Sequence, residues 1–275
     1  MSVTTHCLPN GSLGVDELPI PNIKSNLTTM TPVGLKRGVV VLMHGMLTNT
    51  THTIPLTLEN GLPFLPVRIL ALANDLVSNG WVVLYPIYQE DLYVGIPSQG
   101  VYNDINSDTG NGARYLNNLF TWWDHMVVYI RQTYGSWPIV PMGVSWGGYR
   151  TIQVAANRTS TIAAYATHVP PTVLSQASPA WTPPVNFGLI NTSGLNIASN
   201  RLNSVTSKPG IIGWGTADSA VGFTNIQALY NTALAAGCPV TSNPRTTDHI
   251  LDATDVTTYI NWFQSTVHPL APAVY

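Results

Sequence analysis

A serine lies between two glycines in the stretch PMGVSWGGYR, residues 141–150. Ser145 has Gly143 two positions before it and Gly147 two positions after it. Glycines at this spacing allow a sharp turn between a strand and a helix, which lifts the hydroxyl out of the sheet at the N-terminus of the helix. There the amide of Trp146 would point toward any oxyanion that forms. Ser145 is therefore a candidate nucleophile, and the alternative is a solvated turn serine without chemistry.

A serine nucleophile requires two further groups. Its hydroxyl is weakly nucleophilic near neutral pH, so an imidazole must accept its proton and a carboxylate must orient that imidazole. Downstream, the apolar run GIIGWG leads into a turn that presents Asp218, and TTDH places His249 in a loop before the last helical segment. We expect Asp218 to be the orienting acid and His249 the base. Asp248 and Asp252 are alternative acids, although the side chains of adjacent residues such as Asp248 and His249 usually point apart.

The segments that would position these residues alternate between short apolar runs and longer runs with helical periodicity. The expected strands are 37–43, 81–86, 139–144, 162–168, 210–215 and, more weakly patterned, 238–242. The expected helices are 64–78, 113–134, 146–157, 224–236 and 253–267. Nearly continuous apolar strands suit a sheet that is covered on both faces. The pattern predicts the α/β class, with a mostly parallel central sheet flanked by helices.

Glycine and proline mark the boundaries of these elements. Gly80, Gly135 and Gly237 each follow a predicted helix, where a left-handed cap is favoured. Residues 1–36 are polar and contain four prolines, and they could supply one or two antiparallel edge strands. Residues 169–206 lack periodicity and are rich in Pro, Ser and Asn, which predicts a short irregular lid between two strands. We expect residues 1–275 to form a single domain that includes this lid.

The chain order Ser145, Asp218, His249, each at the predicted C-terminal end of a strand, resembles that of the α/β-hydrolase family. The resemblance extends from Arg37 to the C-terminus. It implies that Ser145 is the nucleophile, Asp218 the acid and His249 the base, with no cofactor. It also marks VLMHGM, residues 41–46, as the strand and turn that complete the oxyanion hole, with the amide of Met46 as the second donor beside that of Trp146. The lid of such enzymes lies where residues 169–206 fall.

Further side chains are candidates for contact with a substrate. They are His44, Leu47, His168 and Trp181. Three roles remain open at this point: His44 can be a structural residue of the oxyanion turn, His168 a satisfied core histidine, and Trp146 either a wall of the acyl pocket or a residue of helix packing. No pair of His, Asp or Glu residues has metal-ligand spacing on a helix, so we expect no metal site.

These residues predict a hydrolase of carboxylic esters that works through an acyl-enzyme. We expect a short or medium acyl group, because the lid is short and Trp146 is bulky. The loop 88–106 is dense in Tyr and Asn, which suits contact with sugar rings and makes acyl groups on glycans a second substrate class; the alternative is a hydrated loop. A peptidase of the same fold, or a catalytically silent binding or structural protein, would be the competing functions.

The composition limits the partners of the chain. Of its 275 residues 45% are hydrophobic and only 9% are charged, with a formal net charge of -2. It therefore has no basic surface for nucleic acid and no apolar run of about 20 residues for membrane insertion. We expect a soluble protein without a visible signal peptide. Its low charge and its abundant Thr and Asn suit an extracellular or particle-associated surface. Oligomeric state stays open.

Overall fold

The computed structural model describes residues 2–7, 26–43, 67–87, 113–173, 196–218, 221–249 and 251–270. The strands in these segments are β1 (Ser2–Cys7), β2 (Asn26–Thr31), β3 (Gly38–Met43), β4 (Trp81–Ile87), β5 (Ile139–Val144), β6 (Tyr165–His168), β7 (Gly210–Gly215) and β8 (Val240–Arg245). The helices are α1 (Val67–Ser78), α3 (Ala113–Tyr134), α4 (Trp146–Asn157), α5 (Phe223–Ala235) and α6 (Ala253–Trp262).

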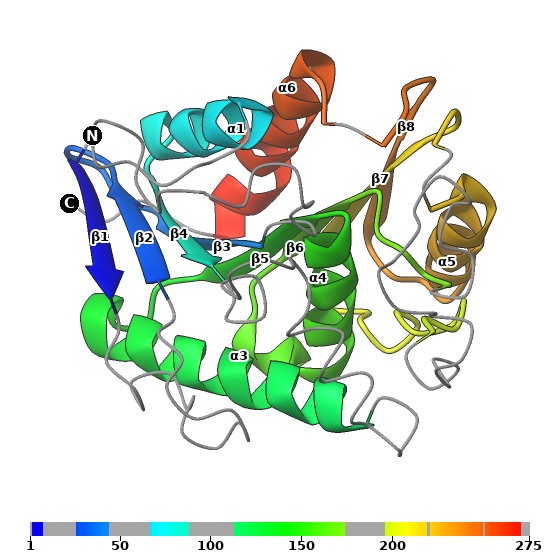
Figure 1. Ribbon diagram of the computed structural model, residues 1–275, viewed down its shortest axis with the longest axis horizontal. Coiled ribbons are helices and arrows are strands. Elements are labelled where there is room, and N and C mark those ends of the chain that lie inside the picture. Colours follow the sequence, from blue (N-terminus) through cyan, green and yellow to red (C-terminus); the bar gives the residue numbers. More distant parts are fainter. Residues whose placement is uncertain are drawn as a thin grey trace, which may run out of the picture.

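The strands form one sheet in the order β1-β2-β4-β3-β5-β6-β7-β8 (Figure 1). The strands β3 to β8 run parallel to one another. At one edge, β2 pairs antiparallel with both β1 and β4. The N-terminal region thus supplies the antiparallel edge that its polar, proline-rich sequence predicted. The mostly parallel sheet flanked by helices is confirmed.

Two apolar layers cover the sheet. Along β3, Val39 and Val41 belong to the cluster that includes α3, α4 and α5, whereas Val40 and Leu42 belong to the cluster that includes α1 and α6. Successive side chains of a strand point to opposite faces, so a strand buried on both sides must be apolar at every position. All residues of β3 are buried. Figure 1 shows α1 and α6 above the sheet and α3 and α4 below it.

The helix boundaries agree closely with the sequence pattern. The predicted segments 113–134 and 146–157 are the helices α3 and α4. The glycines after α1, α3 and α5 have positive φ values of 88° (Gly80), 70° (Gly135) and 81° (Gly237), as expected for left-handed caps. The predicted helix 253–267 is α-helical only to Trp262 and continues as a π-helical turn to Val267.

Two strand boundaries were placed wrongly. The strand expected at 162–168 begins at Tyr165, and the strand expected at 238–242 lies at Val240–Arg245. In β8 every residue from Val240 to Arg245 is aligned with a residue of β7. The limits of both strands follow from pairing with β7, a tertiary property that hydrophobicity along the chain does not encode.

The predicted lid is described only at its ends. Residues 174–195 lie outside the described residues, but the amide of Ile197 donates to the carbonyl of Thr172 at 2.8 Å. The segment therefore leaves and rejoins the fold at one place, as an excursion after β6. Within the described segments, no helix combines the length and the apolar character that crossing a membrane requires.

Candidate active site

The direction of the strand connections selects the edge where a site can form. From β3 the chain leads to β4 on one side of it, whereas from β5 it leads through α4 to β6 on the other side. Adjacent parallel strands whose connections diverge leave a crevice beyond their carboxyl ends. The strand β5 ends at Val144. Ser145 is the next residue, and so it lies at this crevice.

Ser145 occupies a strained turn. Its φ is 53° and its ψ is -122°, a conformation that L-residues rarely adopt. Its amide donates to the carbonyl oxygen of His168 at 2.9 Å, and its carbonyl accepts from the amide of Tyr149 at 3.0 Å, which begins α4. A Cβ on Gly143 would overlap the backbone of Gly147. The glycines therefore allow α4 to pack directly against β5, and the turn is held at both its amide and its carbonyl.

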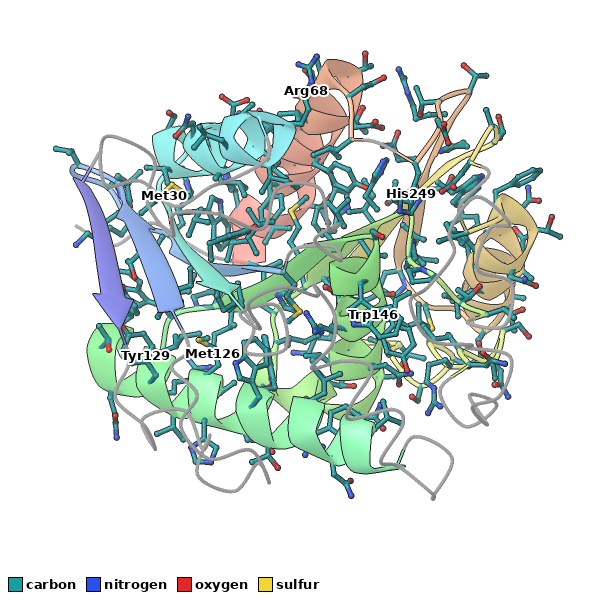
Figure 2. The ribbon with its side chains drawn as sticks, viewed as in Figure 1. Met30, Arg68, Met126, Tyr129, Trp146 and His249 are labelled. Carbon is teal, nitrogen blue, oxygen red and sulfur yellow. The ribbon has the colours of Figure 1, made fainter. Side chains whose placement is uncertain are left out.

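His249 joins Ser145 to Asp218. Its Nε2 lies 2.8 Å from Oγ of Ser145, and its Nδ1 lies 2.8 Å from Oδ2 of Asp218. With hydrogen on Nδ1, the imidazole donates to the carboxylate and Nε2 accepts from the serine hydroxyl. The side chain of Asp218 is 1% exposed and that of His249 is 26% exposed. The acid is thus shielded from water, whereas the imidazole remains accessible. Figure 2 labels His249 and, separately, Trp146, the residue that follows Ser145.

The loops that carry the acid and the histidine are bonded to each other. The amide of Thr216 donates to the carbonyl of Arg245 at 2.7 Å, and the amide of Ala217 donates to that of Thr247 at 3.2 Å. A Cβ on Gly215 would overlap the carbonyl of Thr247, so the close approach of the two loops depends on this glycine. The amide of Val221 donates to the other oxygen of Asp218 at 3.1 Å. These bonds fix the acid relative to the imidazole.

The alternative acids have other partners. Oδ1 of Asp248 accepts from the backbone amide of His249 at 2.7 Å. Asp252 is the N-cap of α6, where its side chain accepts from the amide of Asp255. That hydrogen bond lowers the pKa of Asp252. Among the three carboxylates, Asp218 is the one at Nδ1 of the imidazole.

Only one half of the predicted oxyanion hole is described. Trp146 is the first residue of α4, so its amide lies at the N-terminus of the helix, beside Ser145. The ring of Trp146 is 3% exposed and stacks on Tyr149 with centroids 4.7 Å apart. The structure therefore favours helix packing over a pocket wall as the role of this ring. Met46, the predicted second donor, lies outside the described residues.

Among the expected substrate contacts, only His168 is described; His44, Leu47 and Trp181 lie outside the described residues. The side chain of His168 is fully buried, and its Nδ1 is 3.1 Å from the hydroxyl of Tyr259. This burial and this contact favour a satisfied core histidine, the alternative role named above. Tyr259 could not be singled out from the sequence, because it lies 91 positions from His168. In the described segments, no group of three or more His, Cys, Asp or Glu residues could hold a metal ion.

Comparison with known proteins finds similarity in structure only. No protein-family model matches the sequence, and no curated protein does. Among solved structures, a sugar hydrolase (YeeB) from Lactococcus lactis superposes with a TM-score of 0.65 at 13% identity, over 98% of this chain and 100% of that one. Est1E from Butyrivibrio proteoclasticus, with ferulic acid bound, has a TM-score of 0.61 at 19% identity, over 88% of this chain and 94% of that one.

A third similar structure is the acylaminoacyl peptidase of Pyrococcus horikoshii. Its TM-score is 0.62 at 14% identity. The match covers 88% of this chain but only 39% of the peptidase, so the chain corresponds to one part of that longer protein. Together these likenesses show that the chain has the α/β-hydrolase fold.

Proposed function

We propose, from the α/β-hydrolase fold and the contacts of His249, that this protein is a serine hydrolase that cleaves carboxylic esters through an acyl-enzyme. One observation carries the proposal: Nε2 of His249 is 2.8 Å from Oγ of Ser145, while its Nδ1 is 2.8 Å from Asp218. A nucleophile, a base and an orienting acid in mutual contact constitute the arrangement that acyl transfer requires.

In the first half of the reaction, Oγ of Ser145 attacks the ester carbonyl carbon while its proton moves to Nε2 of His249. The carboxylate of Asp218 stabilises the imidazolium and holds the ring in its orientation. The negative charge on the carbonyl oxygen is stabilised by the amide of Trp146 and, as the sequence predicts, by that of Met46. The imidazolium then gives its proton to the departing alkoxide, and an acyl-serine remains.

In the second half, a water molecule takes the place of the alcohol. His249 accepts a proton from this water, whose oxygen attacks the acyl carbon. The resulting tetrahedral intermediate collapses to the carboxylic acid, and the proton on His249 returns to Oγ of Ser145. The 26% exposure of the imidazole is compatible with this step, because water must reach Nε2 once the alcohol has left.

The proposed substrates are esters with a short or medium acyl group, including acyl groups on glycans. The preference for short or medium acyl groups comes from the sequence, which predicts a lid at residues 169–206 that is too short for a full helical cap domain. Likeness to a sugar hydrolase and to Est1E with bound ferulic acid motivates testing aromatic and sugar esters. Likeness to a peptidase makes acylated amino-acid anilides the competing substrates.

The test is hydrolysis of p-nitrophenyl esters from acetate to palmitate, alongside methyl ferulate, acetylated xylose and an acylaminoacyl p-nitroanilide. We expect turnover to be highest with short acyl chains and to be lost in Ser145→Ala. Labelling of Ser145 by a fluorophosphonate should be lost in the same variant. Faster cleavage of the anilide would instead identify a peptidase. Absence of both turnover and labelling in the unmodified protein would identify a catalytically silent fold.

A further inference from the structure

A wholly buried carboxylate lies in the first turn of α6. Asp255 has no exposed surface. Its Oδ1 accepts from Nδ2 of Asn243 at 2.9 Å, and its Oδ2 accepts from the backbone amide of Asp252 at 3.0 Å. Nε of Arg245 is 3.9 Å from Oδ1, and Nε2 of His168, which carries charge only when both ring nitrogens are protonated, is 3.8 Å from Oδ2. Burying a carboxylate is costly unless such partners compensate it, which raises the question of what this carboxylate does.

The partners of this carboxylate lie at both ends of the segment that carries the catalytic base. Asn243 and Arg245 belong to β8, which precedes residues 246–251, and Asp252 begins α6, which follows them. His249 is in the segment between. The side chain of Asp255 therefore links the end of β8 to Asp252 at the start of α6. This link limits how far the loop that carries His249 can shift.

The carboxylate of Asp255 also lies near β6, the strand whose last residue, His168, binds the backbone of Ser145. The hydroxyl of Tyr259 donates to the carbonyl of Thr167 at 2.8 Å, so the 3.1 Å contact with Nδ1 of His168 is donated by the imidazole. A Cβ on Gly213 would overlap the Tyr259 hydroxyl and lie 2.7 Å from Nδ1 of His168. The backbone carbonyl of His168 in turn accepts from the amide of Ser145. Through Tyr259, α6 thus contacts the end of β6, where the carbonyl of His168 binds the amide of Ser145.

Burial, reinforced by the nearby charge of Asp255, raises the pKa of Tyr259. Its hydroxyl therefore keeps its proton and continues to donate to Thr167 over the working pH range.

We propose that Asp255 is a positioning residue, which holds the segment 246–251 against β6 so that the imidazole of His249 meets the hydroxyl of Ser145. It touches none of the reacting atoms and acts through the backbone of its neighbours. This proposal rests on the function proposed above. A displacement of about 1 Å in a catalytic group can lower a rate by about 100-fold, so a residue of this kind is expected to affect kcat far more than KM.

The experiment compares Asp255→Asn with Asp75→Asn, a control that makes the same change at an exposed carboxylate of α1. For each folded variant we would measure kcat and KM with the best ester and the thermal midpoint of unfolding. We expect Asp255→Asn to lower kcat by about 10- to 100-fold with KM changed by less than about two-fold. Asp75→Asn should match the unmodified protein. An unchanged kcat in folded Asp255→Asn would overturn the proposal.

A reciprocal exchange separates positioning from general destabilisation. In the double variant Asn243→Asp with Asp255→Asn, the amide at position 255 donates to the new carboxylate and its oxygen still accepts from the amide of Asp252. We expect this variant to recover most of kcat, and failure to recover it with an intact fold would count against the proposal. If Asp255→Asn does not fold, Asn243→Ser removes one donor and keeps the buried carboxylate; an unchanged kcat there would refute the same idea.

A spectroscopic measurement keeps this test separate from that of the proposed function. The hydrogen shared between Nδ1 of His249 and Asp218 should give a far-downfield proton NMR signal, assigned by its absence in His249→Gln. We expect the signal to broaden or vanish in Asp255→Asn but to persist in Asp75→Asn. If the unmodified protein neither hydrolyses esters nor reacts with a fluorophosphonate, the proposed function fails. The NMR signal still decides the positioning role, since its persistence in Asp255→Asn would overturn it.

Discussion

Nδ1 of His249 lies 2.8 Å from Oδ2 of Asp218, although the two residues are 31 positions apart in the chain. The contact joins the loop after β7 to the loop after β8, and backbone hydrogen bonds between the same loops hold the pair in register. Asp248 is adjacent to His249 in sequence but contacts its backbone amide instead. The acidic residue next to His249 in the sequence is therefore not the one that contacts its imidazole.

Replacement of the orienting acid should separate Asp218 from Asp248. We expect Asp218→Asn to lower kcat by about 10⁴-fold, because an amide favours the wrong tautomer of the imidazole. Asp248→Asn should leave kcat within about two-fold, since its side chain bonds to the backbone of His249 and not to the ring. Steady-state kinetics with a p-nitrophenyl ester would measure both variants. Equal losses in the two would show that the acid has been assigned wrongly.

Stability should depend on pH through His268. Burial and the nearby charge of Arg37 lower the pKa of His268 from 6.5 to about 4, and its Nε2 accepts from the indole of Trp81 at 3.0 Å. Below pH 6.5 the unfolded chain binds a proton at this residue that the folded protein does not bind until about pH 4. The stability that it contributes above pH 6.5 is therefore lost progressively as the pH falls through this window.

His268→Gln provides the matched variant for this dependence, because its amide oxygen can accept from Trp81 but does not titrate in this range. Urea unfolding of both proteins at pH 7, 5.5 and 4.5 would give the two slopes of free energy against pH. We expect the slope of the unmodified protein to be the steeper. Parallel slopes would contradict a lowered pKa at this residue.

The N-cap of α6 should contribute to stability. The side chain of Asp252 accepts from the amide of Asp255 at 2.8 Å. We expect Asp252→Ala to lower the free energy of unfolding by about 1 kcal/mol, and Asp252→Asn by less, since asparagine retains an acceptor. Because the pKa of Asp252 is lowered by that hydrogen bond, the contribution is present above pH 3.8 and is lost as the pH falls below it. Urea unfolding at pH 7 and pH 3 would show whether the difference between Asp252 and Ala disappears in acid.

The close approach of α4 to β5 predicts different costs at two glycines. Gly143→Ala would place a Cβ against the backbone of Gly147, where no flexible side chain can yield, and we expect a loss of about 3 kcal/mol or failure to fold. Gly135→Ala meets nothing within 4 Å and suffers only from its positive φ, which costs about 1 kcal/mol. Thermal unfolding of the two variants would compare these costs. A milder effect at Gly143 than at Gly135 would contradict the packing described here.

The local sequence was sufficient to predict the elements whose limits depend on nearby residues. The glycine caps, the helix 146–157 and the strand 139–144 lie where periodicity and turn chemistry predict them. The order of Ser145, Asp218 and His249 along the chain was also readable, because each follows a predicted strand and the carboxyl ends of parallel strands share one edge of the sheet. These features follow from rules that act within a few residues, which is why a single sequence reveals them.

Other features were decided by the tertiary structure. The limits of β8 follow from its pairing with β7. The ring of Trp146 stacks on Tyr149, which favours helix packing among the two roles that the sequence left open. Asp255 was not singled out, although Asp252-x-x-Asp255 has the spacing of a capping box and could have signalled a helix start. Its burial among Asn243, His168 and Arg245 depends on how two strands, β6 and β8, pack with α6. Contacts between residues that are distant in the chain leave no local pattern, so only the folded arrangement identifies the side chains that surround Asp255.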